Sequence, residues 1–423
     1  MERRKTTLFL AMAGVLVVSL AARPFHRAQG NATPQKPVPP SPSSGPSFAS
    51  TVRFAYGGNV AEVPAEFIGG LVLLPLHVNQ SQPCLFVLDS TAASTSIDPS
   101  RAAELGIVTG KSAELEFAGV TMSLTELPAA AKPGFDTQFG RAYEGTLGED
   151  FFETFVIGID YARKTVRLYD PGTYQYSGHG KGFHISFSGS TPVVRAKFNA
   201  NGKTLEADFG VDTALDTSVL FSERYANAHH MLSHFKTIPA MDESPDPTQG
   251  ALLGRLRLFQ IGPFPVQQAI ATFSEKSSEK GPEKRGGPIG SGQLAGEIGG
   301  GMLHRFTVIF DYPHQQIIFD PNSERRTDEI EDMSGISVIA QGPGLRGFEV
   351  TQVRPGTPGA EAGLQKGDVI AGIDEDPAAD LSLMQVRGLF RLLGHPYRLT
   401  VERNDQTLHL TLKLKRLLPD NEE

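Results

Sequence analysis

The sequence predicts a mainly β protein made of two similar lobes and a smaller C-terminal β module. Three observations support this fold class. The 423 residues include 45 Gly and 30 Pro but no Trp, a composition typical of short strands joined by many turns. One long segment occurs twice with the same pattern of residues. After residue 334 the pattern changes to a compact run of strands and two short helices.

The composition suits a soluble chain of two or three domains. Hydrophobic residues make up 39% and charged residues 20% of the sequence, and the formal net charge is −8. No clustered basic face is evident, so we expect no nucleic-acid partner. We also expect no cofactor. Cys84 is the only cysteine, which excludes an internal disulfide.

The N-terminus is typical of an export signal. Three cations at residues 3–5 precede an apolar run from Leu8 to Ala22, and small residues suited to cleavage lie near Ala21. We assign residues 1–29 to a signal peptide or an uncleaved N-terminal anchor, and residues 30–50 to a Pro- and Ser-rich linker. The expected location is periplasmic or secreted, with any membrane contact made through that anchor.

An internal repeat sets the remaining boundaries. Residues 145–161 align without a gap with residues 296–312, and both copies share a Gly-x-aliphatic-Gly step, a Phe and an Asp-Tyr pair. Before each copy, two strands lead to an Asp, Asp89 in the first and Asp212 in the second. We expect lobes at 51–172 and 173–322, a linker at 323–334 and the C-terminal module at 335–418. The expected strands are 71–78, 84–88, 165–169, 193–198, 205–211 and 316–319, the expected helices are 99–105 and 222–232, and a mobile loop is expected over 274–293.

Two carboxylates delivered by two similar lobes can meet across a twofold axis. Carboxylates a few ångströms apart cannot both ionise, so the pair shares one proton. One carboxylate then acts as a base on a water molecule while the other donates a proton to the peptide carbonyl. This pattern indicates peptide hydrolysis by Asp89 and Asp212 without a covalent intermediate.

Several short motifs resemble those of retropepsin-like aspartic proteases. Val211-Asp212-Thr213-Ala214, followed by Val219-Leu220, resembles the first signature of that family. The segment 296–299 resembles its second signature, and 145–148 is the matching step of the first lobe. The resemblance covers about residues 60–320 and implies two acid-protease-like β-barrel lobes with a catalytic pair at Asp89 and Asp212. It implies supporting roles for Ser90, Thr213, Ala214, Leu147, Gly148, Ile298 and Gly299.

The first lobe departs from the family pattern and leaves two registers open. Thr91 stands where the family has Gly or Ala. In one register Asp89 remains the acid, and a β-branched residue occupies a turn that favours small side chains. In the other, shifted by one residue, Ser90 takes the acid position and the carboxylate is lost. The sequence therefore supports an aspartic endopeptidase or, as the alternative, an inactive protease-fold protein that binds peptides.

Other polar motifs indicate structural roles. His229 and His230 lack a metal-ligand partner at helical spacing, so surface or packing roles are expected. Asp160 and Asp311 each precede a Tyr before a turn, where a carboxylate commonly accepts hydrogen bonds from the turn. No nucleophile–base pair supports a hydrolase of another class.

The C-terminal module resembles a PDZ domain. Residues 355–370 carry Ala-Gly-Leu and Gly-Asp-Val-Ile in the order found in that family, and 335–339 and 348–353 alternate as strands. The resemblance implies a small β-barrel with two helices, the second at 381–393 beside a peptide groove. PDZ domains add a peptide strand to a sheet edge and hold its carboxylate with loop amides. The implied loop is Met333, Ser334, Gly335 and Ile336, and the implied partner is a polypeptide substrate or a peptide C-terminus.

Overall fold

The computed structural model describes residues 51–131, 135–233, 235–241, 251–274 and 294–419. The expected signal segment, the linker at 30–50 and nearly all of the expected loop at 274–293 lie outside these residues. The chain is mainly β, as the sequence predicts. Short 3-10 turns occur at Ala55–Gly57, Met231–Ser233, Ser323–Arg326, Pro343–Leu345 and Ala378–Asp380.

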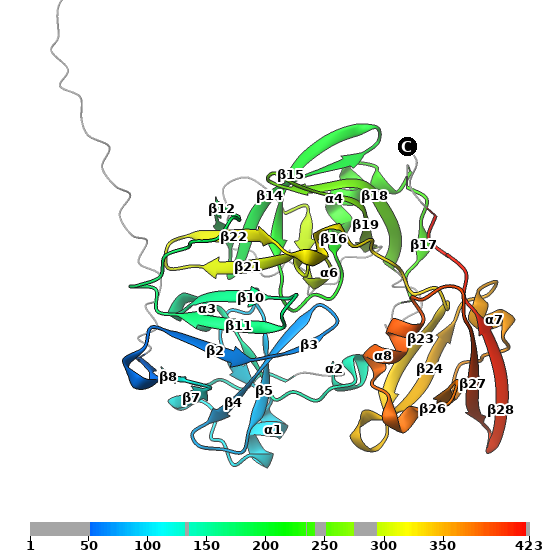
Figure 1. The fold of residues 1–423 in the computed structure, drawn as a ribbon, viewed down its shortest axis with the longest axis horizontal. Coiled ribbons are helices and arrows are strands. Elements are labelled where there is room, and N and C mark those ends of the chain that lie inside the picture. Colours follow the sequence, from blue (N-terminus) through cyan, green and yellow to red (C-terminus); the bar gives the residue numbers. More distant parts are fainter. Residues whose placement is uncertain (1–50, 132–134, 234, 242–250, 275–293, 420–423) are drawn as a thin grey trace, which may run out of the picture. The chain divides into compact units, whose positions relative to one another are not determined.

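The first lobe is a curled sheet with three short helices (Figure 1). The described strands follow the order β1-β8-β7-β4-β5-β9-β6, and β3 pairs with β4. Every side chain of the strand that leads to Asp89 is buried, which fits its position inside the sheet. The elements are β1 (Thr51–Phe54), β3 (Glu66–Ile68), β4 (Leu71–Val78), β5 (Cys84–Leu88), β6 (Ser96–Ile97), α1 (Pro99–Glu104), β7 (Ala113–Phe117), β8 (Val120–Leu124), α2 (Phe135–Phe139), β9 (Gly145–Leu147) and α3 (Glu149–Thr154).

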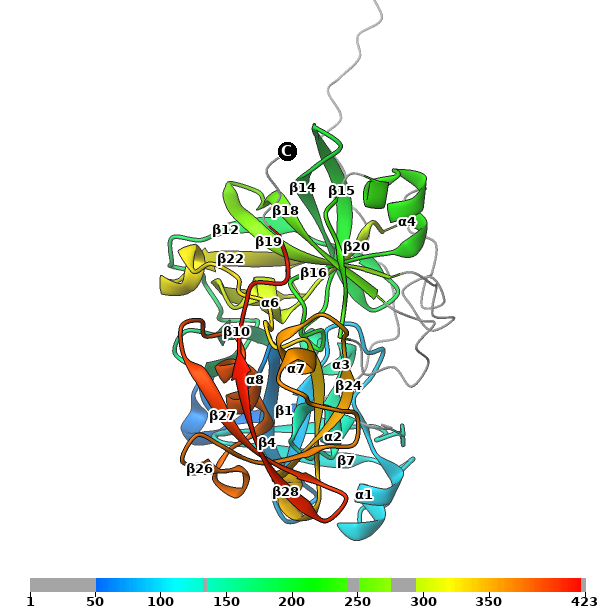
Figure 2. The same cartoon turned by 90° about the vertical axis from the view of Figure 1, so that its right-hand side faces the viewer.

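The second lobe repeats this plan with longer strands, among them β14 (Thr191–Ala200) and β15 (Lys203–Val211), whose ribbons extend at the top of Figure 2. Asn201 and Gly202, between its first two long strands, both have positive φ, as a tight two-residue hairpin turn requires. The expected helix over 222–232 is interrupted, because His230 adopts a left-handed φ of 50° that a helix cannot continue. The elements are β13 (Ser186–Ser188), β14 (Thr191–Ala200), β15 (Lys203–Val211), β16 (Val219–Phe221), α4 (Glu223–Ala228), β17 (Ile238–Pro239), β18 (Ala251–Ile261), β19 (Phe264–Ser274), β20 (Gly296–Ile298) and α6 (Gly300–Leu303).

A sheet shared by both lobes was not predicted from the sequence. Its order is β12-β22-β21-β10-β11-β2, and its two central strands belong to the two copies of the repeat. The conserved spacing of the copies places Ile157 opposite Phe310 and Ile159 opposite Val308. Buried apolar side chains then form one core through both lobes. The elements are β2 (Val60–Pro64), β10 (Val156–Asp160), β11 (Thr165–Tyr169), β12 (Lys181–His184), β21 (Phe306–Asp311) and β22 (Gln316–Pro321).

The C-terminal module has a core of its own. Its sheet runs in the order β23-β24-β25-β27-β28, so the first strand lies at an edge. The second helix is shorter than the expected 381–393, and a capping box between Ser382 and Gln385 fixes its start. The elements are β23 (Ile336–Gln341), β24 (Gly347–Val353), α7 (Pro358–Glu361), β25 (Val369–Ile373), β26 (Asp376–Pro377), α8 (Leu383–Leu389), β27 (Pro396–Arg403) and β28 (Gln406–Lys413).

Candidate active site

Each lobe delivers its Asp from the same three-strand arrangement. In lobe 1, β5 pairs in parallel with β9, and β6 pairs antiparallel with β9. In lobe 2, β15, β20 and β16 repeat these pairings. The Asp89 N–H donates to the Leu147 carbonyl at 3.0 Å, and the Asp212 N–H donates to the Ile298 carbonyl at 2.9 Å. The two Asp residues therefore occupy equivalent positions at the ends of equivalent strands.

The second Gly of each repeated step is required by close packing. A Cβ on Gly148 would lie 2.4 Å from the Ser94 carbonyl carbon, and a Cβ on Gly299 would lie 2.3 Å from the Thr217 carbonyl oxygen. Ser94 and Thr217 each lie five residues after their Asp. In both lobes, therefore, the Asp loop passes directly over a glycine that no other residue can replace without moving backbone.

Ser90 and Thr213 join the two Asp loops by a set of buried hydrogen bonds. The Ser90 N–H donates to Thr213 Oγ1 at 3.0 Å, and the Thr213 N–H donates to Ser90 Oγ at 3.1 Å. The Ser90 hydroxyl donates to the Val211 carbonyl at 2.7 Å, and the Thr213 hydroxyl donates to the Leu88 carbonyl at 2.8 Å. Both residues are fully buried. The bridge is twofold, with Ser90 in the position of Thr213, so Asp89 rather than Ser90 corresponds to Asp212.

Thr91 fits its turn and binds the neighbouring carboxylate. Its N–H and its hydroxyl donate to Asp89 Oδ1 at 2.9 and 2.6 Å, and the Ala92 N–H donates to the same oxygen at 3.0 Å. In lobe 2, the Ala214 N–H donates to Asp212 Oδ1 at 2.8 Å. Thr91 thus adds a hydroxyl donor to one oxygen of Asp89 that the equivalent residue of lobe 2, Ala214, cannot supply.

Two buried tyrosines that the sequence reasoning missed as site residues lie near the Asp loops. The Tyr312 hydroxyl donates to the Ser90 carbonyl at 3.4 Å. Burial, together with the charges of Glu149, Asp89 and Asp212, raises the pKa of Tyr312 well above its usual value. Burial and then the charge of Asp212 raise the pKa of Tyr161. Both are the Tyr of the repeated Asp-Tyr pair, so the repeat itself carried the signal.

The Asp residues of those pairs hold turns, as expected. Asp160 Oδ1 accepts the Arg163 N–H at 3.0 Å, and Asp311 Oδ1 accepts the His314 N–H at 3.3 Å. Neither side chain therefore belongs to the set of groups around Ser90 and Thr213.

An apolar cluster lies beside the two Asp loops, and we call it the dyad-side cluster. Val87, two residues before Asp89, belongs to it, and Ala214, two residues after Asp212, packs against it. The aromatic rings of α2 stack with centroids 5.2 Å apart, and one of them meets Tyr143 edge-on. The cluster comprises Leu71, Leu73, Leu85, Val87 and Tyr143, with Ile68, Phe135, Phe139 and Ala214 packed against it.

The implied carboxylate loop of the C-terminal module is assembled, but most of its amides already have partners. The Met333 N–H donates to the Phe390 carbonyl at 2.9 Å. The Ser334 N–H donates to Asp332 Oδ1 at 2.8 Å, and the Ile336 N–H donates to Ser334 Oγ at 3.3 Å. Burial raises the pKa of Asp332 to about 6. The side chains of Met333 and Ser334 are fully buried.

Comparison with known families decides what this module is. Residues 330–414 match the family model of the PDZ domain. This part of the chain is a PDZ domain. A solved structure of the HtrA3 PDZ domain bound to a phage-derived ligand (FGRWV) is similar, with 22% identity and a TM-score of 0.19. The match covers 21% of this chain and 89% of that one.

Two further solved structures are similar to parts of the chain. The photosystem II D1 C-terminal processing protease is 24% identical with a TM-score of 0.19, over 20% of this chain and 23% of that one. The aspartic proteinase from Irpex lacteus is 13% identical with a TM-score of 0.37, over 63% of this chain and 99% of that one. This last likeness is weak. Among curated proteins, none matches the sequence.

The linker to the PDZ domain contributes a carboxylate to lobe 2. In lobe 1, Thr95, six residues after Asp89, donates its hydroxyl to Asp150 at 2.7 Å. In lobe 2, Ser218, six residues after Asp212, donates its hydroxyl to Glu329 at 2.7 Å. The repeat has Gly301 where lobe 1 has Asp150, so Glu329 supplies the missing acceptor. Burial raises the pKa of both Asp150 and Glu329.

A second group of linker contacts is also buried. Arg255 of β18 pairs with Glu331 at 2.6 Å, with both side chains at most 3% exposed. The other oxygen of Glu331 accepts the N–H groups of Leu417 and Leu418 at 3.3 and 3.2 Å. The segment entering the PDZ domain and the segment leaving it are therefore joined at the buried Glu331 carboxylate, which pairs with Arg255 of lobe 2.

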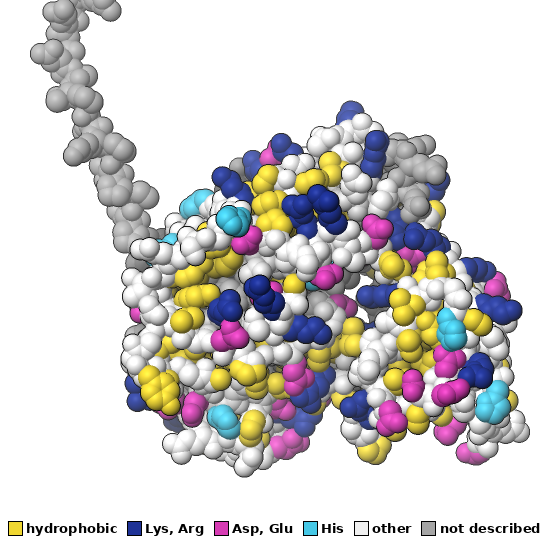
Figure 3. Space-filling view, in the orientation of Figure 1, with side chains coloured by type: hydrophobic (Ala, Val, Ile, Leu, Met, Phe, Trp, Pro, Cys, Tyr) yellow, Lys and Arg dark blue, Asp and Glu magenta, His cyan; other side chains and the backbone are white. Residues whose placement is uncertain are grey.

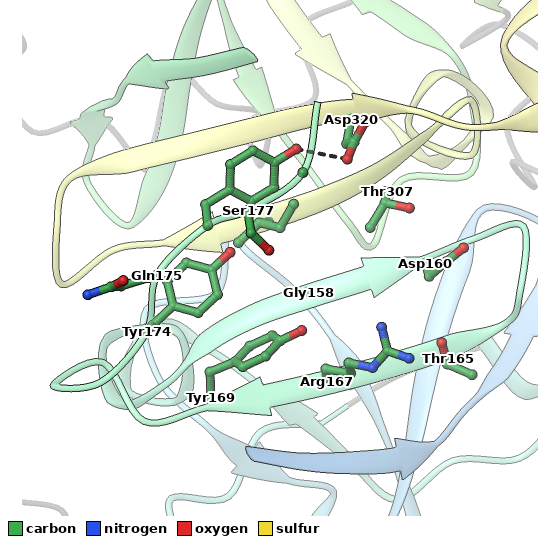
Figure 4. A pocket seen from close by; sticks show the side chains of 13 residues that line it. Gly158, Asp160, Thr165, Arg167, Tyr169, Tyr174, Gln175, Ser177, Thr307 and Asp320 are labelled. Carbon is green, nitrogen blue, oxygen red and sulfur yellow. Dashed lines mark hydrogen bonds between the residues drawn. The ribbon is translucent and has the colours of Figure 1, made fainter. Parts of the chain in front are cut away.

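A pocket of about 220 Å³ lies on the outer face of the shared sheet (Figure 4). Its tyrosines come from β11 and the segment after it, and the Tyr176 hydroxyl donates to Asp320 at 2.8 Å. Strand residues on this face alternate with those facing the common core. None of the site residues expected from the sequence lines this pocket.

Further features of the described residues bear on the requirements of a metal site and of a cysteine nucleophile. No group of three or more His, Cys, Asp or Glu among them could hold a metal ion. The His229 ring packs on Tyr225 with centroids 4.1 Å apart, a packing role. Burial raises the pKa of the Cys84 thiol to about 12, which disfavours the thiolate form that acts as a nucleophile. No described helix has the length and hydropathy needed to cross a membrane. Figure 3 shows acidic and basic side chains interspersed over the visible face.

Proposed function

We propose that this protein is an exported aspartic-type endopeptidase whose PDZ domain binds peptides. The observation that carries the proposal is the twofold bridge between Ser90 and Thr213, because it gives Asp89 and Asp212 equivalent positions on facing loops. The charged and then apolar start of the sequence supports export.

In the proposed reaction, the two carboxylates share one proton and hold a water molecule. One carboxylate takes a proton from the water as it attacks the peptide carbonyl, and the other donates its proton to the carbonyl oxygen. The donors from Thr91 and Ala92 fix one oxygen of Asp89, which leaves its other oxygen for the water. The dyad-side cluster offers an apolar surface for a substrate side chain beside these loops.

The test is cleavage of a peptide mixture from a denatured protein between pH 3 and 7. Asp89→Asn and Asp212→Asn should each lower the rate by at least about 10²-fold, because either change removes the shared proton or the base. The rate of the unaltered chain should fall on both sides of an optimum, since only the singly protonated pair is active. Asp160→Asn, which alters a turn carboxylate, serves as the matched control and should retain activity.

The PDZ domain favours a second candidate function, an inactive protease-fold protein that only binds peptides. A folded wild-type chain that captures peptides but cleaves none at any pH would support this candidate and overturn the first. Equal rates in the wild type and both Asp→Asn variants would point to a contaminating peptidase and would also overturn the proposed dyad.

A further inference from the structure

Two elements of the PDZ domain, β23 and α8, are in contact with a segment of lobe 1. The helix α2 packs against the edge strand β23. Just after α2, Gly140 lies so close to the PDZ domain that a Cβ on it would be 2.8 Å from Leu383 Cβ and 3.5 Å from Ala340 Cβ. Leu383 begins α8 and Ala340 lies near the end of β23, and both are completely buried. These two elements border the groove into which PDZ domains add a peptide strand.

Several backbone groups of β23 and of the implied carboxylate loop already form hydrogen bonds within the chain. The Arg387 guanidinium, on α8, donates to the Val338 carbonyl of β23 at 3.0 Å. The amides of Met333, Ser334 and Ile336 are bonded within the chain, as described above. One carbonyl of β23 and three amides of the implied carboxylate loop therefore already have partners within the chain.

The opposite side of the same segment reaches the proposed catalytic loops. Phe135 and Phe139 pack in the dyad-side cluster together with Ala214. Two ion pairs fasten the segment to lobe 1. Arg101 pairs with Asp136 at 3.0 Å, and Arg141 pairs with Glu66 at 2.6 Å. The segment Phe135–Gly140 thus contacts the dyad-side cluster through its two Phe rings and the PDZ domain through α2 and Gly140.

We propose that segment Phe135–Gly140 is an internal occupant of the PDZ groove, and that an extended peptide competing for β23 frees this segment and uncovers the dyad-side cluster. This proposal rests on the proposed function and concerns how the proposed peptide cleavage is regulated. The ligand class is a peptide able to add a strand to β23. A peptide can shift the equilibrium between the bound and the released segment only by binding more tightly to the form in which the segment is released. It must therefore compete with a segment of the same chain, whose effective concentration at β23 is high.

A reversible cross-link tests the proposal. A Cβ on Gly140 would lie 3.5 Å from Ala340 Cβ, at the short end of the Cβ–Cβ range of a disulfide, so Gly140→Cys and Ala340→Cys can be joined once Leu383, 2.8 Å from the same Cβ position, shifts by a few tenths of an ångström. Cys84 is buried, and its raised pKa of about 12 keeps it from competing. The oxidised double variant should cleave a denatured-protein peptide mixture at least about 10-fold more slowly than the same protein after reduction. Equal rates in the two forms would overturn the proposal.

Peptide capture separates this proposal from the proposed function. The probe is a pooled peptide library randomised at its last four residues and applied to the immobilised full chain. The reduced double variant should retain peptides and the oxidised one should not. Gly140→Cys and Ala340→Cys alone, treated with the same oxidant, control for strain at Gly140, whose φ is +67°.

Each result of the capture experiment is decisive even if the chain cleaves nothing. If only the reduced form captures peptides and neither form cleaves them, internal occupancy of the groove is supported and the proposed endopeptidase activity is overturned. Equal capture by both forms, or no capture by the reduced form, overturns the proposal. If the double variant does not fold, amide hydrogen exchange of the wild type replaces it. The library should speed exchange in α2, and unchanged exchange would contradict the proposal.

Discussion

Ser90 and Thr213 hold two peptide groups from each other's lobe in a region that water does not reach. A buried amide or carbonyl left without a partner costs about 1–3 kcal/mol, more than the net value of the hydrogen bond itself. The hydroxyls of Ser90 and Thr213 therefore have a structural role, because they position the two loops that carry Asp89 and Asp212. A neighbouring residue, Thr91, binds the Asp89 carboxylate with both its N–H and its hydroxyl.

Replacing Ser90 tests this bridge at the scale of one side chain. Ser90→Ala should lower the free energy of unfolding by about 1–3 kcal/mol, since the Thr213 N–H and the Val211 carbonyl lose their partner. Ser90→Thr, which reproduces the residue of lobe 2, should retain most of the stability. Urea denaturation measures both variants. A Ser90→Ala protein as stable as the wild type would show that the bridge contributes nothing.

The paired strand-and-loop units are the elements that carry the site. In each, a parallel strand pair and a third antiparallel strand position an Asp loop above a glycine. β4, β5 and β11 have the limits expected from the sequence, because their apolar runs end at clear turn residues. The helix expected at 222–232 was too long, since the left-handed His230 has no counterpart in hydrophobic periodicity.

A methyl group tests the packing of one unit. Gly148→Ala would place Cβ 2.4 and 2.5 Å from two backbone atoms of Ser94, which cannot move as a side chain could. We expect a loss of about 1–3 kcal/mol or more in unfolding free energy. Gly388→Ala is the matched control, because Gly388 lies in α8 with nothing within 4 Å of its Cβ position, and should be neutral or slightly stabilising. Thermal melts that rank the two variants equally would contradict the packing argument.

At the scale of the whole molecule, the linker ties the PDZ domain into lobe 2. Glu329 completes the hydrogen bonding of the loop after Asp212, and Glu331 forms a buried pair with Arg255. Burying two charges is costly, so such a pair adds little net stability, but removing one partner leaves the other charge uncompensated. The arrangement makes the PDZ linker part of the lobe rather than a free tether.

Breaking this buried pair should weaken the whole assembly. Glu331→Gln should lower the free energy of unfolding by about 1–3 kcal/mol, because it removes the charged acceptor of the hydrogen bond from the Arg255 guanidinium. The double variant Glu331→Met with Arg255→Met should lose much less, since it removes both charges. Guanidinium denaturation of the single and double variants gives the comparison. Single and double losses of the same size would mean that the charge pair is not the cause.

The sequence by itself determined the mainly β class, the two copies of the lobe, the positions of Asp89 and Asp212 along the chain, and the PDZ domain. Those features depend on local signals: alternation, turn residues, a repeat without gaps and a continuous motif. The expected register of the first lobe remained open between Asp89 and Ser90, because both give acceptable local patterns.

Only the tertiary structure decided that register, since the deciding hydrogen bonds join Ser90 and Thr213, which are 123 positions apart. The same holds for Glu329 in the place of Asp150, for the sheet shared between the lobes and for α2 at the PDZ groove. Each depends on which distant surfaces meet, and a pattern of neighbouring residues carries no information about that contact.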